Sequence, residues 1–206
     1  MLQLLHDLGV DIHRANNDGG RPIHDAALKG HDNVMQLLIS LRTCIDAQDN
    51  EGRTPCWAAS GMGHTKVIRL LILHGAVVDL ANKQRMTPLW MAAQENKPEC
   101  IAILAAAKAS LDAISRNGGT PMCAAAHKGG ADSVRLLAYL GARLTDGNGN
   151  HFTRYSNEDK NRVFDRELWQ RISREGGDEG TADSLRKRIR MLKEAKVHDP
   201  RDGTSW

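Results

Sequence analysis

The sequence predicts an all-α fold in which a pair of short helices is repeated along the chain. Four prolines, Pro22, Pro55, Pro88 and Pro121, are each separated by 33 residues. Aromatic residues make up only 4% of the 206 residues, a composition that suits small helices packed closely through alanines and aliphatic side chains. A pair of small residues and an apolar doublet recur at the same interval. A fixed interval of this length indicates a stack of similar supersecondary units.

The small pair lies four and five positions after each proline, and the apolar doublet lies fifteen and sixteen positions after it. The small pairs are Ala26-Ala27, Ala59-Ser60, Ala92-Ala93 and Ala125-Ala126. The doublets are Leu37-Leu38, Leu70-Leu71, Ile103-Leu104 and Leu136-Leu137. Because both features keep the register of the prolines, each unit is predicted to contain the same two helices.

The first helix of each unit is predicted to begin at the Thr-Pro step. Proline at the first helical position loses no needed N–H group, and the preceding Thr can cap the helix. This helix should end near Gly30, Gly63 or Gly129, since glycine readily adopts the left-handed conformation that terminates a helix. The second helix has apolar residues at helical spacing and should end at Gly75 or Gly141. Polar, turn-rich segments connect the units.

Four sequence segments carry a resemblance to a known family: "RPIHDAALKGH" from Arg21, "TPCWAASGMGH" from Thr54, "TPLWMAAQENK" from Thr87 and "TPMCAAAHKGG" from Thr120. With the Leu-Leu doublet, they closely resemble the ankyrin repeat, over residues 1 to about 147. The resemblance implies an ankyrin-repeat solenoid with units at 16–48, 49–81, 82–114 and 115–147. Residues 1–15 fit the second helix of a partial unit. Because the chain begins half-way through a unit, it is either a true start or a fragment of a longer protein, and we favour the fragment.

Several positions depart from the repeat pattern. Arg42 and Lys108 replace the glycine that ends the second helix, so either they adopt a left-handed conformation at about 1 kcal/mol each or the turn changes. Arg85 replaces the hairpin glycine, and Asn96-Lys97 replaces the Gly-His step. These changes make unit 82–114 the most divergent one.

A histidine of the family motif is kept in only one unit. In the family this side chain hydrogen-bonds to nearby Thr and backbone groups. Here His24 keeps the position, while Trp57, Trp90 and Cys123 occupy it in the other units. Since an indole can donate but cannot accept a hydrogen bond, packing is expected to replace part of this bonding.

Residues 148–206 lose the repeat and are predicted to form a charged, helical C-terminal extension. One predicted helix places Phe164, Leu168 and Ile172 on one face, and we expect it to cap the end of the stack. After the "GGDEG" link, a second predicted helix places further apolar residues on one face.

The second predicted helix of the extension carries a dense run of basic residues. The simplest interpretation is a solvated helix face, and the sharper one is contact with phosphates or with an acidic protein surface. The absence of interleaved aromatic residues argues against single-stranded nucleic acid as the partner. The six basic residues are Arg186, Lys187, Arg188, Arg190, Lys193 and Lys196.

Composition and motifs do not favour an enzyme or a membrane protein. The formal net charge is +3, which by itself argues neither for nor against a nucleic-acid partner. Cys44, Cys56, Cys100 and Cys123 form no CxxC pair, so we expect them to be small buried residues in a reducing compartment. Neither a signal-like start nor a long apolar run is seen. The chain is therefore predicted to be intracellular, in the cytoplasm or the nucleus.

No nucleophile motif, phosphate loop or metal-ligand spacing was found in the sequence. The sequence therefore predicts no catalytic activity, no cofactor, no metal and no small-molecule substrate. His24, His31 and His64 are expected to be structural because each holds a motif position of the repeat.

The resemblance implies a protein–protein interaction module that binds a partner through a concave groove. In the family, variable residues at the hairpin tips and late in the first helices line this groove. The corresponding residues here are Asn50, Glu51, Arg53, Met62, Lys83, Gln84, Arg85, Met86, Gln94, Glu95, Arg116, Asn117, His127 and Lys128. Lys83, Arg85 and Arg116 meet no acid within their own tips, which favours an acidic or phosphate-bearing partner there.

Two alternatives remain open at the level of sequence. One is a structural subunit of a larger assembly, including a ribonucleoprotein, that uses the basic C-terminal helix. The other is the regulatory repeat region of a larger enzyme. The identity of a partner does not follow from a fold that serves many recognition tasks.

Overall fold

The computed structural model describes residues 11–150. The helix expected in the partial unit falls mainly on residues 1–10 and therefore lies outside the described residues. The two helices predicted for the C-terminal extension also lie outside them, as do their basic residues. The predicted all-α solenoid is confirmed by the eight helices of the described part.

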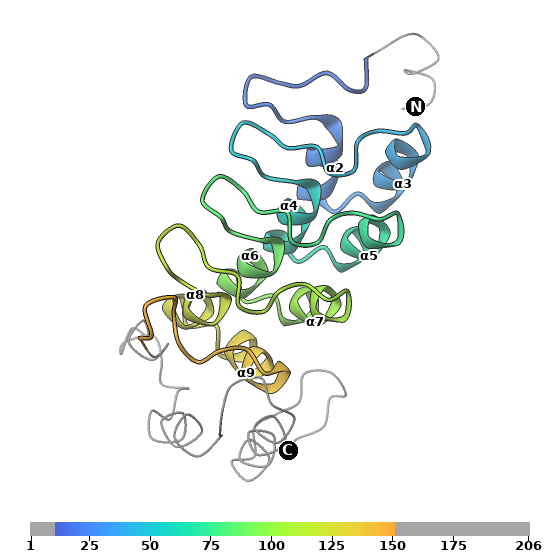
Figure 1. Cartoon of the computed structure of the whole chain (residues 1–206). Coiled ribbons are helices and arrows are strands. Elements are labelled where there is room, and N and C mark those ends of the chain that lie inside the picture. Colours follow the sequence, from blue (N-terminus) through green and yellow to red (C-terminus); the bar gives the residue numbers. More distant parts are fainter. Residues whose placement is uncertain (1–10, 151–206) are drawn as a thin grey trace.

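The helices alternate between two layers along the stack (Figure 1). The first helices of the units are α2 (Pro22–Lys29), α4 (Pro55–Met62), α6 (Pro88–Gln94) and α8 (Pro121–Lys128). The second helices are α3 (Asp32–Ser40), α5 (Thr65–Leu73), α7 (Pro98–Ala106) and α9 (Ala131–Leu140). Each first helix packs on the first helix of the next unit, and each second helix packs on the next second helix. The hairpins that join the units project together from one side of the stack.

The Thr-Pro steps begin the first helices as the sequence predicts. The hydroxyl oxygens of Thr54, Thr87 and Thr120 each accept a hydrogen bond from the backbone N–H three residues later, at 3.1, 3.2 and 3.4 Å. In the first unit Arg21 holds the Thr position, and its N–H instead donates to the His24 Nδ1 atom at 3.1 Å. A buried acceptor near a helix start satisfies an N–H group that has no partner within the helix.

Arg42 and Lys108 adopt the left-handed conformation, with φ of 57° and 66°. Of the two alternatives, a left-handed residue in an unchanged turn or a changed turn, the first is therefore correct. Beyond each second helix, the same backbone hydrogen bond forms whether the left-handed residue is Gly75 or a basic residue: Thr43 donates to Leu38 at 3.2 Å, and Ala76 donates to Leu71 at 2.9 Å. The closing bond keeps the turn unchanged, at a conformational cost of about 1 kcal/mol for a side chain at this position.

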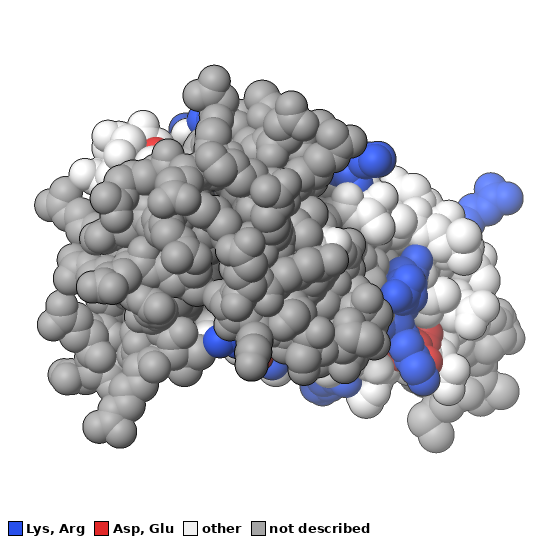
Figure 2. All heavy atoms as spheres, turned by 90° about the horizontal axis from the view of Figure 1, so that it is seen from below, with Lys and Arg blue, Asp and Glu red and all other residues white. Residues whose placement is uncertain are grey.

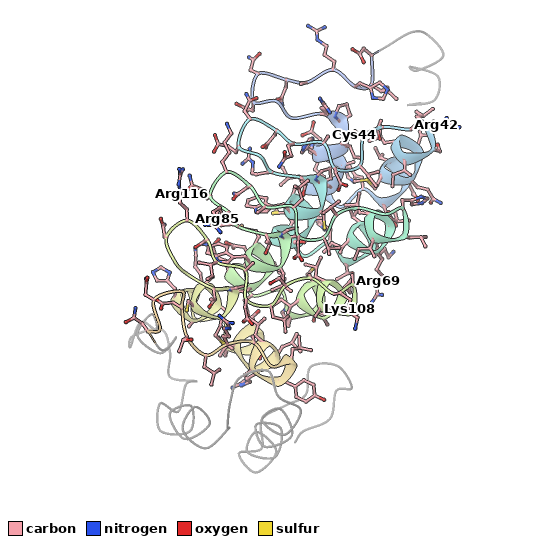
Figure 3. All side chains as sticks on the ribbon, in the orientation of Figure 1. Arg42, Cys44, Arg69, Arg85, Lys108 and Arg116 are labelled. Atoms are coloured by element: carbon pink, nitrogen blue, oxygen red, sulfur yellow. The ribbon has the colours of Figure 1, made fainter. Side chains whose placement is uncertain are left out.

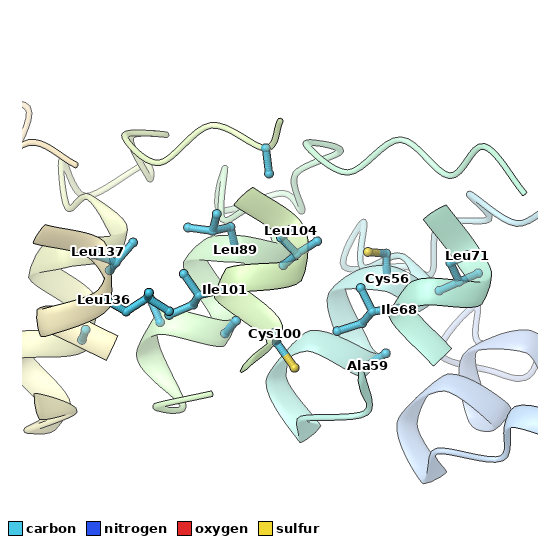
Figure 4. Packing of buried hydrophobic residues seen from close by; sticks show 14 of the residues in the cluster. Cys56, Ala59, Ile68, Leu71, Leu89, Cys100, Ile101, Leu104, Leu136 and Leu137 are labelled. Atoms are coloured by element: carbon cyan, nitrogen blue, oxygen red, sulfur yellow. The ribbon is translucent and has the colours of Figure 1, made fainter. Parts of the chain in front are cut away.

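The core lies between the two helix layers. The second residue of each apolar doublet is fully buried, and Figure 4 shows Leu71, Leu104 and Leu137 projecting from α5, α7 and α9. Small residues of the first helices, such as Ala59, are also fully buried and allow neighbouring helices to approach closely. The recurrent small pair and apolar doublet of the sequence thus meet in one continuous hydrophobic core.

Three of the cysteines are buried, but Cys44 is exposed, so its predicted burial was wrong. Cys44 follows Thr43, whose side chain is buried and donates to the Leu38 carbonyl at 2.8 Å. Thr43 takes the inward position in this connecting segment, and the next side chain points outward. Burial raises the pKa of Cys56 to about 12 and that of Cys100 to about 11.

Aspartates also join successive units on the side of the second helices. The Asp46 carboxylate accepts the Val77 N–H at 3.1 and 3.2 Å, and the Asp79 carboxylate accepts the Ser110 N–H at 3.0 and 3.1 Å. Asp112 accepts the Arg143 N–H at 2.7 Å in the same way. These aspartates recur every 33 residues, a regularity that the sequence analysis missed.

Candidate partner-binding surface

The hairpin tips form a continuous row because backbone hydrogen bonds join each tip to the next. A residue of each tip donates its N–H group to a carbonyl of the preceding tip. The donor and acceptor pairs are Asn50 to Asp18 at 2.9 Å, Lys83 to Glu51 at 3.0 Å and Arg116 to Gln84 at 2.8 Å. The tip residues predicted from separate units are therefore brought together on one edge of the stack (Figure 1).

Several tips are shaped by a polar side chain at their start. The Asp49 Oδ1 atom accepts the N–H groups of Glu51 at 2.9 Å and Arg53 at 2.8 Å. Asn82 Oδ1 does the same one unit later, toward Gln84 at 3.0 Å and Met86 at 2.9 Å. Asp and Asn favour such turns because a short polar side chain can bond its own backbone two residues on.

A further tip of this kind begins at Asp146. Its Oδ1 atom accepts the N–H groups of Asn148 at 2.8 Å and Asn150 at 2.7 Å. The preceding tip begins at Ser115, so this one starts 31 residues later and is two residues out of register with the 33-residue interval. The row of tips therefore continues to the end of the described residues.

Side chains of the first helices bridge to the following hairpin. The His24 Nε2 atom lies 2.9 Å from the Ala47 carbonyl and 3.2 Å from the Arg53 carbonyl. Trp90 holds the same motif position, and its indole N–H donates to the Gly119 carbonyl at 3.2 Å. The indole nitrogen of Trp57 is buried without a hydrogen-bond partner among the described residues. The expected loss of hydrogen bonding thus occurs at Trp57, whereas Trp90 keeps the bridge to the next hairpin.

The His64 ring confirms the structural role expected of the Gly-His step. Its Nε2 atom lies 3.0 Å from the Leu28 carbonyl of the preceding unit. In unit 82–114, where Asn96-Lys97 replaces Gly-His, Asn96 adopts the left-handed conformation with φ of 49°. Its side-chain oxygen also accepts the Ser133 N–H of the following unit at 3.1 Å. One residue thus ends α6 and joins two units.

Most of the candidate binding residues are exposed. The exposed ones are Asn50, Glu51, Met62, Lys83, Gln84, Arg85, Glu95, Arg116, Asn117, His127 and Lys128. The partly buried ones are Arg53, Met86 and Gln94.

Arg53 is held by contacts within the chain. Its Nε atom pairs with Asp49 Oδ2 at 2.7 Å, and its guanidinium carbon lies 6.0 Å from the centre of the Trp57 ring. Burial acts to raise the pKa of Asp49. Hydrogen bonds from Arg53 and Glu51, together with the Arg53 charge, act to lower it and outweigh burial, so the pKa of Asp49 is below its ordinary value. Arg53 therefore stabilises its own tip, and less of it is open to a partner.

The row of tips changes its charge along the stack. Asp18 and Glu51 are exposed on the first two tips, whereas Lys83, Arg85 and Arg116 are exposed on the next two. The three basic side chains form no ion pair or side-chain hydrogen bond within residues 11–150. Figure 3 shows Arg85 and Arg116 at the tips, on the other side of the stack from Arg69 and Lys108. We call Lys83, Arg85 and Arg116 the basic tip cluster.

Other parts of the described surface are also rich in basic residues. Viewed from below, Lys and Arg side chains are more widespread than Asp and Glu on the part that is not grey (Figure 2).

Arg85 has a φ of 60° at a position where the other tips have glycine. A side chain is thus retained at a position that disfavours one.

The described residues hold no group of three or more His, Cys, Asp or Glu side chains placed to bind a metal ion. Burial raises the pKa of each of the three buried thiols, which disfavours the reactive thiolate form. Among the helices of residues 11–150, none is long and apolar enough to span a bilayer. The run from Arg186 to Lys196 lies outside this part of the chain.

Stacked helix pairs joined by hydrogen-bonded hairpins define a helical-repeat solenoid. The family model described as ankyrin repeats (3 copies) matches residues 1–82 and 57–148. The chain therefore belongs to the ankyrin-repeat family. Ankyrin repeats generally serve as protein–protein interaction modules, and the proteins built from them are typically non-enzymatic. A comparison with curated proteins finds no match.

Proposed function

We propose that the chain binds a partner protein through the hairpin tips and the exposed ends of its first helices. The observation that carries this proposal is the row of tips, which backbone hydrogen bonds hold in register. A row fixed before binding loses little conformational entropy when a partner docks on it. The exposed polar and charged side chains along the row supply the contacts that distinguish one partner from another.

The charge of the tips gives the partner an orientation. An acidic or phosphate-bearing segment fits the basic tip cluster, and a basic segment fits the end that carries Asp18 and Glu51. The left-handed Arg85 supports this part of the proposal, because a glycine there would avoid strain but would remove one of the three cations.

The proposal is tested by affinity capture from cell lysate followed by mass spectrometry. The test variant is Arg85→Glu/Arg116→Glu, which reverses two charges of the basic tip cluster. The matched control is Arg42→Glu/Lys108→Glu, which makes the same charge change on the other side of the stack (Figure 3). Both variants replace exposed residues, so both should fold as the wild type does.

We expect the control to retain the captured proteins and the test variant to lose those that bind through acidic segments. Rising salt should release the same proteins from the wild type, because exposed charge pairs are screened at high ionic strength. If the test variant and the control capture the same proteins at every salt concentration, the basic tip cluster has no role in binding.

A further inference from the structure

An open groove of about 800 Å³ lies on the outer side of the second helices, away from the hairpin tips. Its walls come from α5 and α7, and Leu136 of α9 also lines it. The lining is mainly apolar, with Leu73, Ile72 and Ile103 among its residues. None of the proposed tip contacts lies in this groove, so it calls for a separate explanation.

The hollow exists because α7 carries alanines where its neighbours carry larger side chains. Ala102 and Ala106 line the groove, and the residues 33 positions earlier are Arg69 and Leu73 on α5. In α9 the residue that corresponds to Ala106 is Tyr139. The side chains of α7 at these positions are smaller than those of α5 and α9, which leaves a depression in an otherwise regular surface.

A prominent apolar side chain lies beside this depression. Leu73 is 77% exposed, the highest value among the exposed large hydrophobic residues of the described part of the chain. The same surface thus presents a knob on α5 and a hole on α7. An exposed leucine next to an apolar groove indicates a surface that is covered by a protein partner.

The rim carries two unpaired charges of opposite sign. Arg69 lies on α5 and Glu99 on α7, and both line the groove and are exposed. Neither side chain forms an ion pair or a hydrogen bond within residues 11–150. A partner that fits this rim must therefore offer an acid beside Arg69 and a base beside Glu99.

We propose that the partner in this groove is a second copy of the same chain, related by a two-fold axis. An axis parallel to α5 and α7 and midway between them places α5 of each copy on α7 of the other. Leu73 of one copy then lies level with Ala106 of the other and fills the hollow. A two-fold interface repeats every contact, so both grooves are filled at once.

The charges fit the same arrangement. Helical side chains lean toward the N-terminus of their helix, so Arg69 extends toward the level of Glu99 of the other copy. Two identical ion pairs form, one on each side of the axis. The knob, the hole and the two charges all come from one surface, which makes it complementary to itself. The hairpin tips remain free, so such a dimer would present two tip rows.

Sedimentation equilibrium of the full 206-residue chain tests this proposal, from about 5 µM to about 500 µM, the range suited to a weak association. We expect the average mass to rise from 22.6 kDa toward twice that value. Leu73→Asp should weaken association at least about tenfold, because it removes the knob from the centre of the interface. Leu28→Asp is the matched control, since Leu28 is an exposed leucine in the last turn of α2.

Charge reversal gives a result that a merely structural effect would not produce. Arg69→Glu and Glu99→Arg should each weaken association about tenfold, while the double variant should return to within about threefold of the wild type, because the pair is re-formed with its signs exchanged. Thermal unfolding of each variant checks that the fold is intact. A mass that stays at 22.6 kDa throughout, a dimer unaffected by Leu73→Asp, or a double variant weaker than both single variants would each overturn the proposal.

Discussion

The indole N–H of Trp90 donates a hydrogen bond to the carbonyl of Gly119, 3.2 Å away in the hairpin of the next unit. His24 makes the corresponding contact to the Arg53 carbonyl with an imidazole nitrogen. Two chemically different rings thus join a first helix to the following hairpin across the same 29-residue separation. A donor in the right place is sufficient for this bridge, and the ability of histidine to accept is not required.

Trp90→Phe should lower the free energy of unfolding by about 1 kcal/mol more than Trp57→Phe does. The first change removes a hydrogen bond and leaves a partly buried carbonyl with one partner fewer. The second change removes a buried donor that has no partner among the described residues, so it reduces ring packing, including the contact with Arg53, but breaks no hydrogen bond. Urea denaturation of both variants measures the difference. Equal losses would show that the Trp90 bridge contributes nothing.

Gly30→Ala should destabilise the fold more than Gly75→Ala, although both residues have positive φ. Either alanine pays about 1 kcal/mol for the left-handed conformation. A Cβ atom at Gly30 would also collide with the His64 ring, whereas one at Gly75 would meet nothing within 4 Å. The collision disturbs the contact between His64 and the Leu28 carbonyl. Thermal unfolding of the two variants compares them, and an equal loss would mean that the His64 ring moves aside freely.

The helices of residues 11–150 were predictable because their signals are local and repeated. Thr-Pro starts, glycine ends and apolar doublets act within a few residues, and each occurs in several units. The resemblance then specified how the units stack. The conformation of Arg42 and Lys108 was not predictable, because the closing backbone bond that forces it depends on the whole turn.

The sequence predicted which residues of the candidate surface are exposed better than it predicted the contacts among them. Most of the predicted tip residues are exposed, because turns between packed helices face solvent. The sequence did not reveal that Arg53 pairs with Asp49, since Asp46, Asp49 and Glu51 all lie within seven positions of Arg53. The outer groove was missed because its depth depends on three neighbouring helices, not on any one segment.

Asp79→Ala should destabilise the chain by about 1 kcal/mol, because the Ser110 N–H loses its charged acceptor. Asp18→Ala is the matched control, since the side chain of Asp18 is exposed and accepts no hydrogen bond within the described residues. Chemical denaturation measures both variants. A cost at Asp18 as large as that at Asp79 would show that the unit-joining bond is not the cause.

Cys44 should react with a thiol reagent in the native protein much faster than the other three cysteines. Its side chain is exposed, whereas Cys56, Cys100 and Cys123 are buried. Burial also disfavours the thiolate of Cys56 and Cys100, so neither the access nor the reactive form is present at neutral pH. Mass spectrometry after brief alkylation identifies the modified residue. Rapid labelling of Cys56 in the folded chain would contradict the packing of α4.

The raised thiol pKa values also predict a loss of stability in alkali. The pKa of Cys56 is about 12 in the folded chain, against a reference value of 9.0. Between these values the unfolded chain has released the thiol proton while the folded chain retains it, so raising the pH favours unfolding. One such thiol lowers the free energy of unfolding by up to about 1.4 kcal/mol per pH unit in that window. Other groups titrate in the same range, so the informative quantity is the difference between the wild type and Cys56→Ala. The variant should lose less stability between pH 9 and pH 11, and equal slopes would show that the buried thiol does not contribute.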